Sequence, residues 1–436
     1  MVVLQVIVAF ILVLAPLVFF HELGHFVVAK MLRIGVPVFS LGFGPRLFGF
    51  RRKETDYRVS LIPMGGYVRM SGDESDEHRT GAPEEFLSRP RWQRFIVFSA
   101  GAAFNIILAF LVMWFYFGYY GKIEVPYPVV FGVAEGSEAE IAGIQRGDKL
   151  IEIAGHSVED EFVYRYNLEI ALAPNTQKTV LVDRGGERLE IELNTGSDPK
   201  LGMGDPGWSL GRGGGGNPVI ERVLPGGAAE EAGLLAGDRI VGGGNYPSIT
   251  GLEFQLLLEA GVGKEVTLEV EREGEIIPIV VRPRASDERR TIGVDFVSES
   301  APPVQLSIGQ AAVESMRWNL ELSKTLFIVL KRLVTTEVPI KTMSGPVGIA
   351  QVAHQALLSG ADTFLYLLGF FSLQLGILNL LPIPILDGGH ILILVVEGVM
   401  RRNLSDTVKE RVMQAGLVFL LAFMGVIIVL DVLKFF

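Results

Sequence analysis

The stretch "FFHELGHFVVAKML" (residues 19–32) follows a run that is apolar from the first residue onward, apart from Gln5. About 20 apolar residues are needed to cross the hydrocarbon of a bilayer as a helix, so residues 1–34 predict a transmembrane helix, bent near Pro16. No basic residue precedes the run and no small-residue cleavage site follows it, which disfavours a signal peptide. Ionisable side chains inside a membrane are costly and usually functional.

The spacing within this stretch favours metal chemistry. On a helix, His21 and His25 share one face and lie about 6 Å apart, where they can bind one zinc ion. Glu22 lies beside them and can take a proton from an attacking water. The chain has no cysteine, so only histidines and carboxylates remain as plausible zinc ligands. The alternative is a polar helix end that solvent caps.

A third ligand is predicted far along the chain, in "LNLLPIPILDGGH" (residues 378–390). Basic residues gather in 35–94 and 401–411, so both segments are expected on the cytoplasmic side. This orientation brings Asp387 to the same depth as His21, near the cytoplasmic face. Asp387 is therefore the candidate third ligand, and a helix-end cap is the alternative.

The composition indicates a membrane protein with a soluble insert, because 49% of residues are hydrophobic while 20% are charged. A net charge of −10 without a basic patch argues against nucleic acid as a partner. The amphipathic segment 304–360 predicts helices at the membrane interface. The predicted spans are 1–34, 95–118, 361–400 and 410–434.

The insert between the second and third spans repeats itself. "GSEAEIAGIQRGDKLIEIAG" (136–155) aligns without gaps on "GGAAEEAGLLAGDRIVGGGN" (226–245), offset by 90 residues. A period this long is a repeated domain rather than a solenoid unit. The shared pattern resembles the PDZ signature and predicts α+β PDZ domains at 127–212 and 217–298, joined by "GRGGGG" (211–216). PDZ domains bind peptide C-termini through backbone amides.

Residues 35–94 predict a β-hairpin region associated with the membrane. "DYRVSLIPMGGYVRM" (56–70) alternates apolar and polar residues, as strands do. The candidate substrate-binding residues here are Gly65, Gly66 and Tyr67, and an ordinary glycine turn is the alternative.

Taken together, HExxH in the first span, N-x-x-P-x-P-x-L-D-G in the third and PDZ domains between them resemble the site-2 protease family over essentially the whole chain. The resemblance implies zinc-dependent peptide hydrolysis inside the membrane, with His21, His25 and Asp387 as ligands and Glu22 as general base. It also implies that Asn379 engages substrate near the cleaved bond, and that the hairpin edge pairs with substrate as an added strand.

The expected substrates are single-span membrane proteins, such as an anti-sigma factor already cut on its outer side, and signal-peptide remnants. In this family the PDZ domains are implied to filter out substrates with bulky external domains. The expected location is the bacterial inner membrane, with the PDZ domains in the periplasm and the active site near the cytoplasmic side.

Other features remain open from sequence alone. Pro382 and Pro384 interrupt the third span and are candidate substrate contacts, with a plain kink as the alternative. His390 is either a support for the ligands or a hydrogen-bonded structural histidine. The motif "MSGPVGIA" (343–350) has no assigned chemistry. A different class of function also fits: a membrane-anchored PDZ scaffold with a non-catalytic metal site.

Overall fold

The computed structural model describes residues 2–433, apart from 74–79, 123–127, 159–165, 199–202, 213–214, 245–248, 250, 285–291, 301–302 and 336–344. Part of the predicted linker (213–214) and the first two residues of the "MSGPVGIA" motif therefore lie outside the described residues. The chain divides into a helical unit and a β-rich unit. The helical unit comprises Met1–Gly121, Gln305–Phe327 and Met343–Phe436, and the β-rich unit comprises Lys122–Val304 and Ile328–Thr342.

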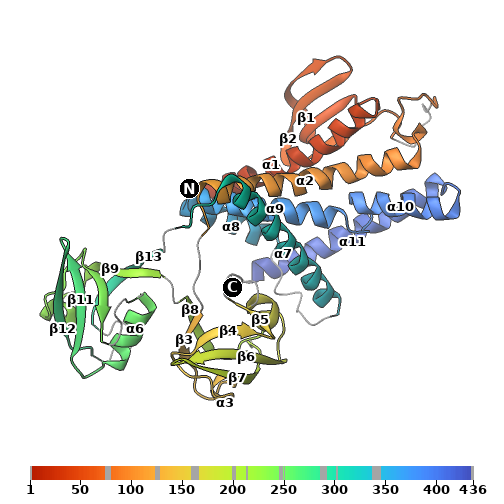
Figure 1. The fold of residues 1–436 in the computed structure, drawn as a ribbon. Helices are drawn as coiled ribbons and strands as arrows, with labels where there is room; N and C mark the ends of the chain where they lie inside the picture. The colour runs from red at the N-terminus through yellow and green to blue at the C-terminus, as the bar shows by residue number, and fades with distance from the viewer. Residues whose placement is uncertain are drawn as a thin grey trace. The chain divides into compact units, whose positions relative to one another are not determined.

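Long helices form most of the first unit (Figure 1). They are α1 (Val2–Met31), α2 (Arg91–Tyr119), α7 (Ile308–Val334, whose last turns belong to the second unit), α8 (Pro346–Ser359), α9 (Ala361–Asn379), α10 (Asp387–Met400) and α11 (Asp406–Leu433), with a short 3-10 turn at Phe86–Ser88. Within the described residues, four helices are long and apolar enough to cross a membrane: Leu4–Met31, Arg91–Tyr119, Ala361–Asn379 and Asp406–Asp431. Four predicted spans thus match four candidate helices.

Small residues let three of these helices approach closely, as is usual for helices packed within a membrane. A Cβ atom on Gly24 of α1 would lie 2.4 Å from the carbonyl oxygen of Ala100 in α2. A Cβ atom on Gly376 of α9 would lie 2.9 Å from the carbonyl oxygen of Ala102. Helix α2 therefore lies between α1 and α9 and contacts both along their length.

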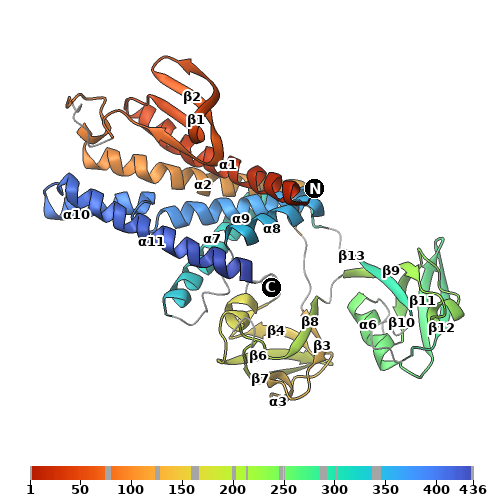
Figure 2. The ribbon, with the colours of Figure 1, turned by 180° about the vertical axis from the view of Figure 1, so that it is seen from behind.

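The predicted hairpin region is a curled sheet made of two long strands, β1 (Val38–Arg52) and β2 (Thr55–Arg69). The start of β1 pairs with residues 66–69 on one side and with residues 56–59 on the other. Strand β2 packs against α1. Figure 2 shows the sheet on the α1 side of the helices and α11 on the opposite side.

The third predicted span is broken into α9 and α10 by residues 380–386, which include Pro382 and Pro384. The glycines that open α10 allow this loop to fold back over it. A Cβ atom on Gly388 would lie 2.1 Å from the carbonyl oxygen of Leu381, and one on Gly389 would lie 2.4 Å from that of Ile383. Only glycine fits at either position, so the loop delivers Asp387 in the first turn of α10.

Helix α8 receives its N-terminal cap from a distant residue. The backbone N–H groups of Gly345 and Gly348 donate to Oδ2 of Asp431, at 2.8 and 3.1 Å. Asp431 lies near the end of α11 and is buried. A carboxylate suits a helix N-terminus because it satisfies free amides and complements the helix dipole. Two glycines of the unassigned "MSGPVGIA" motif thus hold α8 to α11.

The β-rich unit contains two sheets with the same strand order. The first runs β7-β6-β4-β3-β8 and the second β12-β11-β10-β9-β13. The first comprises β3 (Pro128–Val133), β4 (Lys149–Ile153), β5 (His156–Ser157, paired with β4), β6 (Gln177–Arg184), β7 (Glu187–Asn194) and β8 (Trp208–Arg212), with α3 (Glu138–Ile141) and a π-turn at Asn167–Ala171. The second comprises β9 (Gly215–Val223), β10 (Arg239–Gly243), β11 (Val266–Arg272), β12 (Glu275–Val281) and β13 (Val294–Ser300), with α5 (Ala228–Glu231) and α6 (Gly251–Ala260).

One ion pair between a buried aspartate and a half-buried arginine recurs in both sheets. Asp148, in the glycine–aspartate turn of the first repeat, binds the guanidinium of Arg184 through two oxygens at 2.6 and 2.7 Å. Asp238 binds Arg272 in the same way, at 2.7 Å for both bonds. The pairing raises the pKa of both arginines. The repeated pattern in the sequence therefore fixes the same turn twice.

Candidate metal centre

Three side chains from two distant helices meet within the helical unit. Nε2 of His21 and Nε2 of His25 lie 3.3 Å apart, and Oδ2 of Asp387 lies 3.3 and 3.4 Å from them. All three side chains are largely shielded from solvent. Within the described residues, this is the group of histidines and carboxylates that can hold a metal ion.

This triangle fits a tetrahedral zinc ion. Ligands about 2.0–2.1 Å from such an ion lie about 3.3–3.4 Å from one another, so one face of the tetrahedron has the observed edges. Within the part of the chain described, Oδ2 of Asp387 is buried without a hydrogen-bond partner. A buried carboxylate is costly unless it is paired or binds a metal, so this arrangement calls for a cation. The fourth corner is left for water or substrate.

The environment of His25 fixes which of its nitrogens faces the metal position. Nδ1 of His25 donates to the backbone carbonyl of Val97 in α2, at 2.8 Å, which leaves Nε2 with a free lone pair. Gly101, one turn further along α2, provides the space for both rings. A Cβ atom there would lie 2.3 Å from Nε2 of His25 and 2.7 Å from Cε1 of His21.

His21 is supported by two amides. The side chains of Asn105 in α2 and Asn379 at the end of α9 each approach Nδ1 of His21 to 3.4 Å. An asparagine amide presents its oxygen or its nitrogen after a half-turn, and Nδ1–H of a ligating histidine needs an acceptor. Oδ1 of Asn105 is buried and has no partner among the described residues, so it is available for this role.

Glu22 lies beside the candidate metal ligands and against the hairpin. It follows His21 in α1, and its carboxylate lies next to the backbone amide of Val68 in β2. A Cβ atom on Gly66 would lie 3.0 Å from Cγ of Glu22, so glycine lets the strand approach the helix. Residues 66–69 pair with β1 on one side only, within the described residues.

The other residues singled out in the sequence lie around this group. Tyr67 stacks on Phe43 and contacts the Arg58 guanidinium, while Gly65 has a φ of +118° that favours glycine. Pro384 in the loop before α10 meets α11, where a Cβ atom on Gly416 would lie 2.3 Å from its ring. Pro382 lies in the same loop.

His390 is not part of the metal triangle. Its ring stacks on Phe98 of α2, with ring centroids 4.6 Å apart and an angle of 9° between the planes.

Sequence reasoning missed Gly101 and Asn105. They form "GAAFN" (101–105) in an otherwise apolar helix, and a buried asparagine in a predicted span was the available signal.

Comparison with known proteins agrees with this geometry. The model of peptidase family M50 matches residues 9–423. The chain is 33% identical over 442 residues to the regulator of sigma-E protease RseP from Escherichia coli, covering 96% of each chain. It is 30% identical to a putative zinc metalloprotease from Agrobacterium fabrum, covering 96% of this chain and 93% of the relative. The chain therefore belongs to peptidase family M50, the site-2 protease family, and is a zinc metalloprotease.

Proposed function

We propose that the chain is an intramembrane endopeptidase that cleaves single-span membrane proteins, with His21, His25 and Asp387 as zinc ligands and Glu22 as general base. The observation that carries this proposal is the ligand triangle, with edges of 3.3, 3.3 and 3.4 Å. It joins α1, which is long and apolar enough to cross a membrane, to the first turn of α10. Family membership favours this enzyme over a PDZ scaffold with a non-catalytic metal site.

The chemistry follows from the positions of the side chains. When bound, zinc acts as a Lewis acid and makes a water molecule nucleophilic at neutral pH. Glu22 accepts the proton of that water and passes it to the leaving amine, as a general base that becomes a general acid. Val97, Asn105 and Asn379 hold the two imidazoles in the tautomers that ligation needs. Asn379 can also donate to the substrate carbonyl from its place at the end of α9.

The hairpin supports a route for presenting the peptide bond. A transmembrane helix hides its backbone groups in its own hydrogen bonds, so the cleaved segment must be unwound. An added strand on Gly65–Tyr67 replaces those lost bonds, and within the described chain residues 66–69 pair with β1 on one side only, which supports this route. Gly66 lies against Glu22, which supports presentation of the peptide bond beside the proposed general base. Pro382 and Pro384 lie in the loop that interrupts the third predicted span between α9 and α10, and this loop offers backbone groups to the substrate.

The remaining assignments complete the proposal. The two sheets with one strand order are assigned as PDZ domains at 127–212 and 217–298, which bind peptide C-termini and exclude substrates with bulky external domains. We place the protein in the bacterial inner membrane, with these domains in the periplasm and the metal centre near the cytoplasmic side. Anti-sigma factors already cut outside, and signal-peptide remnants, are the proposed substrates.

Glu22→Gln tests the role of the general base. The variant should keep about one zinc ion per chain but lose roughly 100-fold to 10,000-fold of its cleavage rate, the usual contribution of a general base. Elemental analysis and cleavage of a single-span substrate in detergent measure the two quantities. Persistent cleavage at the rate of the unmodified chain would contradict the assignment. An unmodified chain that holds zinc but cleaves no such substrate would favour the scaffold.

A further inference from the structure

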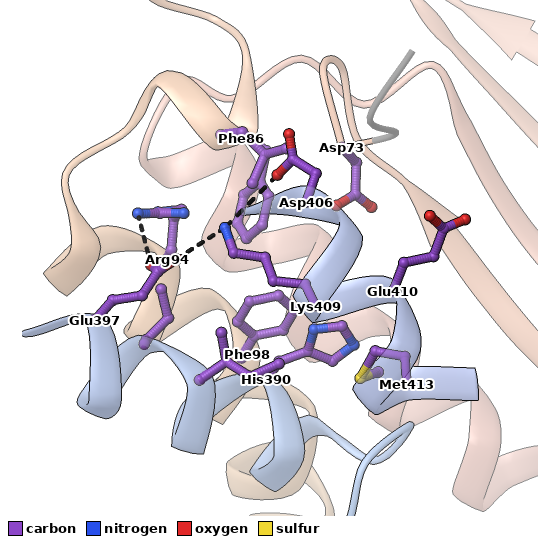
Figure 3. A pocket seen from close by; sticks show the side chains of 13 residues that line it. Asp73, Phe86, Arg94, Phe98, His390, Glu397, Asp406, Lys409, Glu410 and Met413 are labelled. Atoms are coloured by element: carbon purple, nitrogen blue, oxygen red, sulfur yellow. Dashed lines mark ion pairs between the residues drawn. The ribbon is translucent and has the colours of Figure 1, made fainter. Parts of the chain in front are cut away.

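A cavity of about 270 Å³ lies in the helical unit, beside the metal centre but outside it (Figure 3). It is bounded by α2, α10, α11 and the segment that precedes α2. Apolar side chains form part of its wall, chiefly Phe86, Phe98, Ile393, Leu394 and Met413. Ionisable side chains form the rest: Asp73, Arg94, His390, Glu397, Asp406, Lys409 and Glu410. The cavity wall thus combines apolar and charged side chains.

The cavity adjoins the metal centre through two neighbouring contacts. Val97, whose carbonyl binds His25, is followed by Phe98, whose ring stacks on His390 in the cavity wall. Along α10, His390 lies about one turn after Asp387, and Glu397 lies ten residues after it. At 1.5 Å per residue, the cavity therefore extends from about 5 to about 15 Å beyond the ligand carboxylate.

The wall carries four carboxylates and two cations, so its net charge is negative. Glu397 is fully buried, and its Oε1 accepts from Nζ of Lys409 at 2.8 Å. Its Oε2 lies 3.9 Å from the Arg94 guanidinium and has no hydrogen-bond partner in the described chain. Both cations of the wall thus lie close to Glu397, and Nζ of Lys409 also lies 3.9 Å from Oδ1 of Asp406 at the rim (Figure 3). Three further carboxylates lie at the exposed rim: Asp73, Asp406 and Glu410.

We propose that this cavity binds a lysine or arginine side chain on the cytoplasmic flank of the substrate. Single-span membrane proteins concentrate lysine and arginine on that side of the span. The long stem of such a side chain packs on apolar walls while its charged head reaches carboxylates, which is the combination present here. The inference rests on the proposed function and on its orientation in the membrane.

The position of the cavity sets which substrate residues it receives. An extended peptide advances about 3.3 Å per residue, so a cavity between about 5 and 15 Å from Asp387 meets residues about two to five positions from the cleaved bond. A basic residue there is held by the rim carboxylates, and one further out is not. The cavity thus gives the enzyme a preference for substrates with a lysine or arginine at these positions, in addition to its contacts with the substrate backbone.

The test compares two substrates and uses the full-length chain in detergent. One single-span substrate carries lysines two to five residues to the cytoplasmic side of its cleaved bond, and the other carries glutamines there. The measured quantity is the ratio of their kcat/KM values. Each exposed carboxylate makes only a weak ion pair with the substrate, so the double variant Asp406→Asn, Glu410→Gln should lower the ratio about 2-fold to 30-fold. High salt should shrink the same ratio in the unmodified chain.

Matched variants separate this site from the general charge of the surface. Glu84→Gln removes an exposed carboxylate from the segment before α2 that does not line the cavity, and it should leave the ratio unchanged. Glu410→Lys should turn the preference toward a glutamate-flanked substrate. An unchanged ratio in the double variant, or an equal fall in Glu84→Gln, overturns the inference while cleavage of the glutamine substrate still upholds the proposed function. If the unmodified chain cleaves neither substrate, both proposals fail.

Discussion

The two ends of α10 carry buried carboxylates with opposite surroundings. At its first turn, Asp387 faces two imidazoles at 3.3 and 3.4 Å. Ten residues on, Glu397 has Lys409 at 2.8 Å and arginine side chains from α2 at 3.9 Å. The second carboxylate is balanced by cations of the chain itself. The first is not, because a ligating imidazole is neutral.

This difference separates a site built for a metal from a site built for stability. A buried charge must be compensated, and the compensating groups reveal the source of the opposite charge. At Asp387 the neighbouring imidazoles are neutral when they act as ligands, so a bound metal ion must supply the positive charge. At Glu397 the charged side chains of Arg94 and Lys409 neutralise the carboxylate without a bound ion. We therefore expect changes at Asp387 to alter zinc content, and changes at Glu397 to alter folding.

The largest expected effect is that of Asp387→Asn. Replacing an anionic ligand by a neutral amide should lower zinc affinity more than about 100-fold, since even the partners that support ligands contribute 10-fold to 100-fold. Cleavage of a single-span substrate should fall with it. Zinc content after dialysis against a chelator measures the effect. The midpoint temperature of thermal unfolding of the zinc-free variant should not fall, because the buried carboxylate has been removed. A variant that keeps all of its zinc would show that Asp387 is not a ligand.

Glu397→Gln should have the opposite pattern. It leaves the Arg94 and Lys409 charges without their buried partner, and breaking such a pair costs about 3 kcal/mol of the free energy of unfolding. The midpoint of thermal unfolding should therefore fall while zinc content stays at that of the unmodified chain. If this variant lost zinc but kept its unfolding midpoint, the distinction between the two ends of α10 would be wrong.

Gly101→Ala should sharpen the comparison from the side of α2. Its Cβ atom would lie 2.3 Å from Nε2 of His25, so the ring must move and zinc binding and cleavage should both fall, by about 10-fold or more. Gly118→Ala on the same helix is the control, because its Cβ atom would come no closer than 3.8 Å to a neighbour. Alanine there should be neutral or stabilise the helix by up to about 1 kcal/mol. Equal zinc contents in the two variants would contradict the packing argument.

The smallest expected effect is that of Asn105→Ala. Removing the amide leaves Asn379 as the remaining support of His21 Nδ1, so zinc affinity should fall about 10-fold, at the low end for such partners. Asn105→Asp restores an acceptor and should recover part of the affinity. Competition with a chelator of known affinity measures both variants. An alanine variant that binds zinc as tightly as the unmodified chain would leave Asn105 with a packing role only.

The sequence was most informative where a short motif of neighbouring residues carries the chemistry. The interval from His21 to His25 and the "LDGG" turn each mark one half of the candidate metal centre, and the fold brings the two halves together. Charge bias and hydropathy predicted that both halves lie at one depth in the membrane. The 90-residue repeat marked two similar domains, which appear as two sheets of equal strand order. The first, second and fourth spans were predicted to within a few residues of the candidate helices, because bilayer thickness fixes their length. The third was predicted as one span over 361–400, whereas the candidate helix ends at Asn379.

The remaining features depend on tertiary packing between distant parts of the chain and could not be predicted from a single sequence. Gly101 and Asn105 act through neighbours more than 70 positions away, and small residues are common in any membrane helix. Glu397 sits in "LVVEGVM", and its partners come from the start of two other helices. The hairpin was expected as simple alternation, yet β1 pairs with β2 on both of its sides. Such pairing depends on curvature, which alternation does not encode.

The cap on α8 sets an order in which parts of the helical unit can assemble during biosynthesis. Asp431 follows Gly345 by 86 residues, so a ribosome must add α9, α10 and nearly all of α11 before the first amides of α8 gain their carboxylate. Helix α8 packs on α1, which carries both histidines. A nascent chain can therefore close this brace only after both parts of the candidate metal centre, on α1 and at the start of α10, have been synthesised.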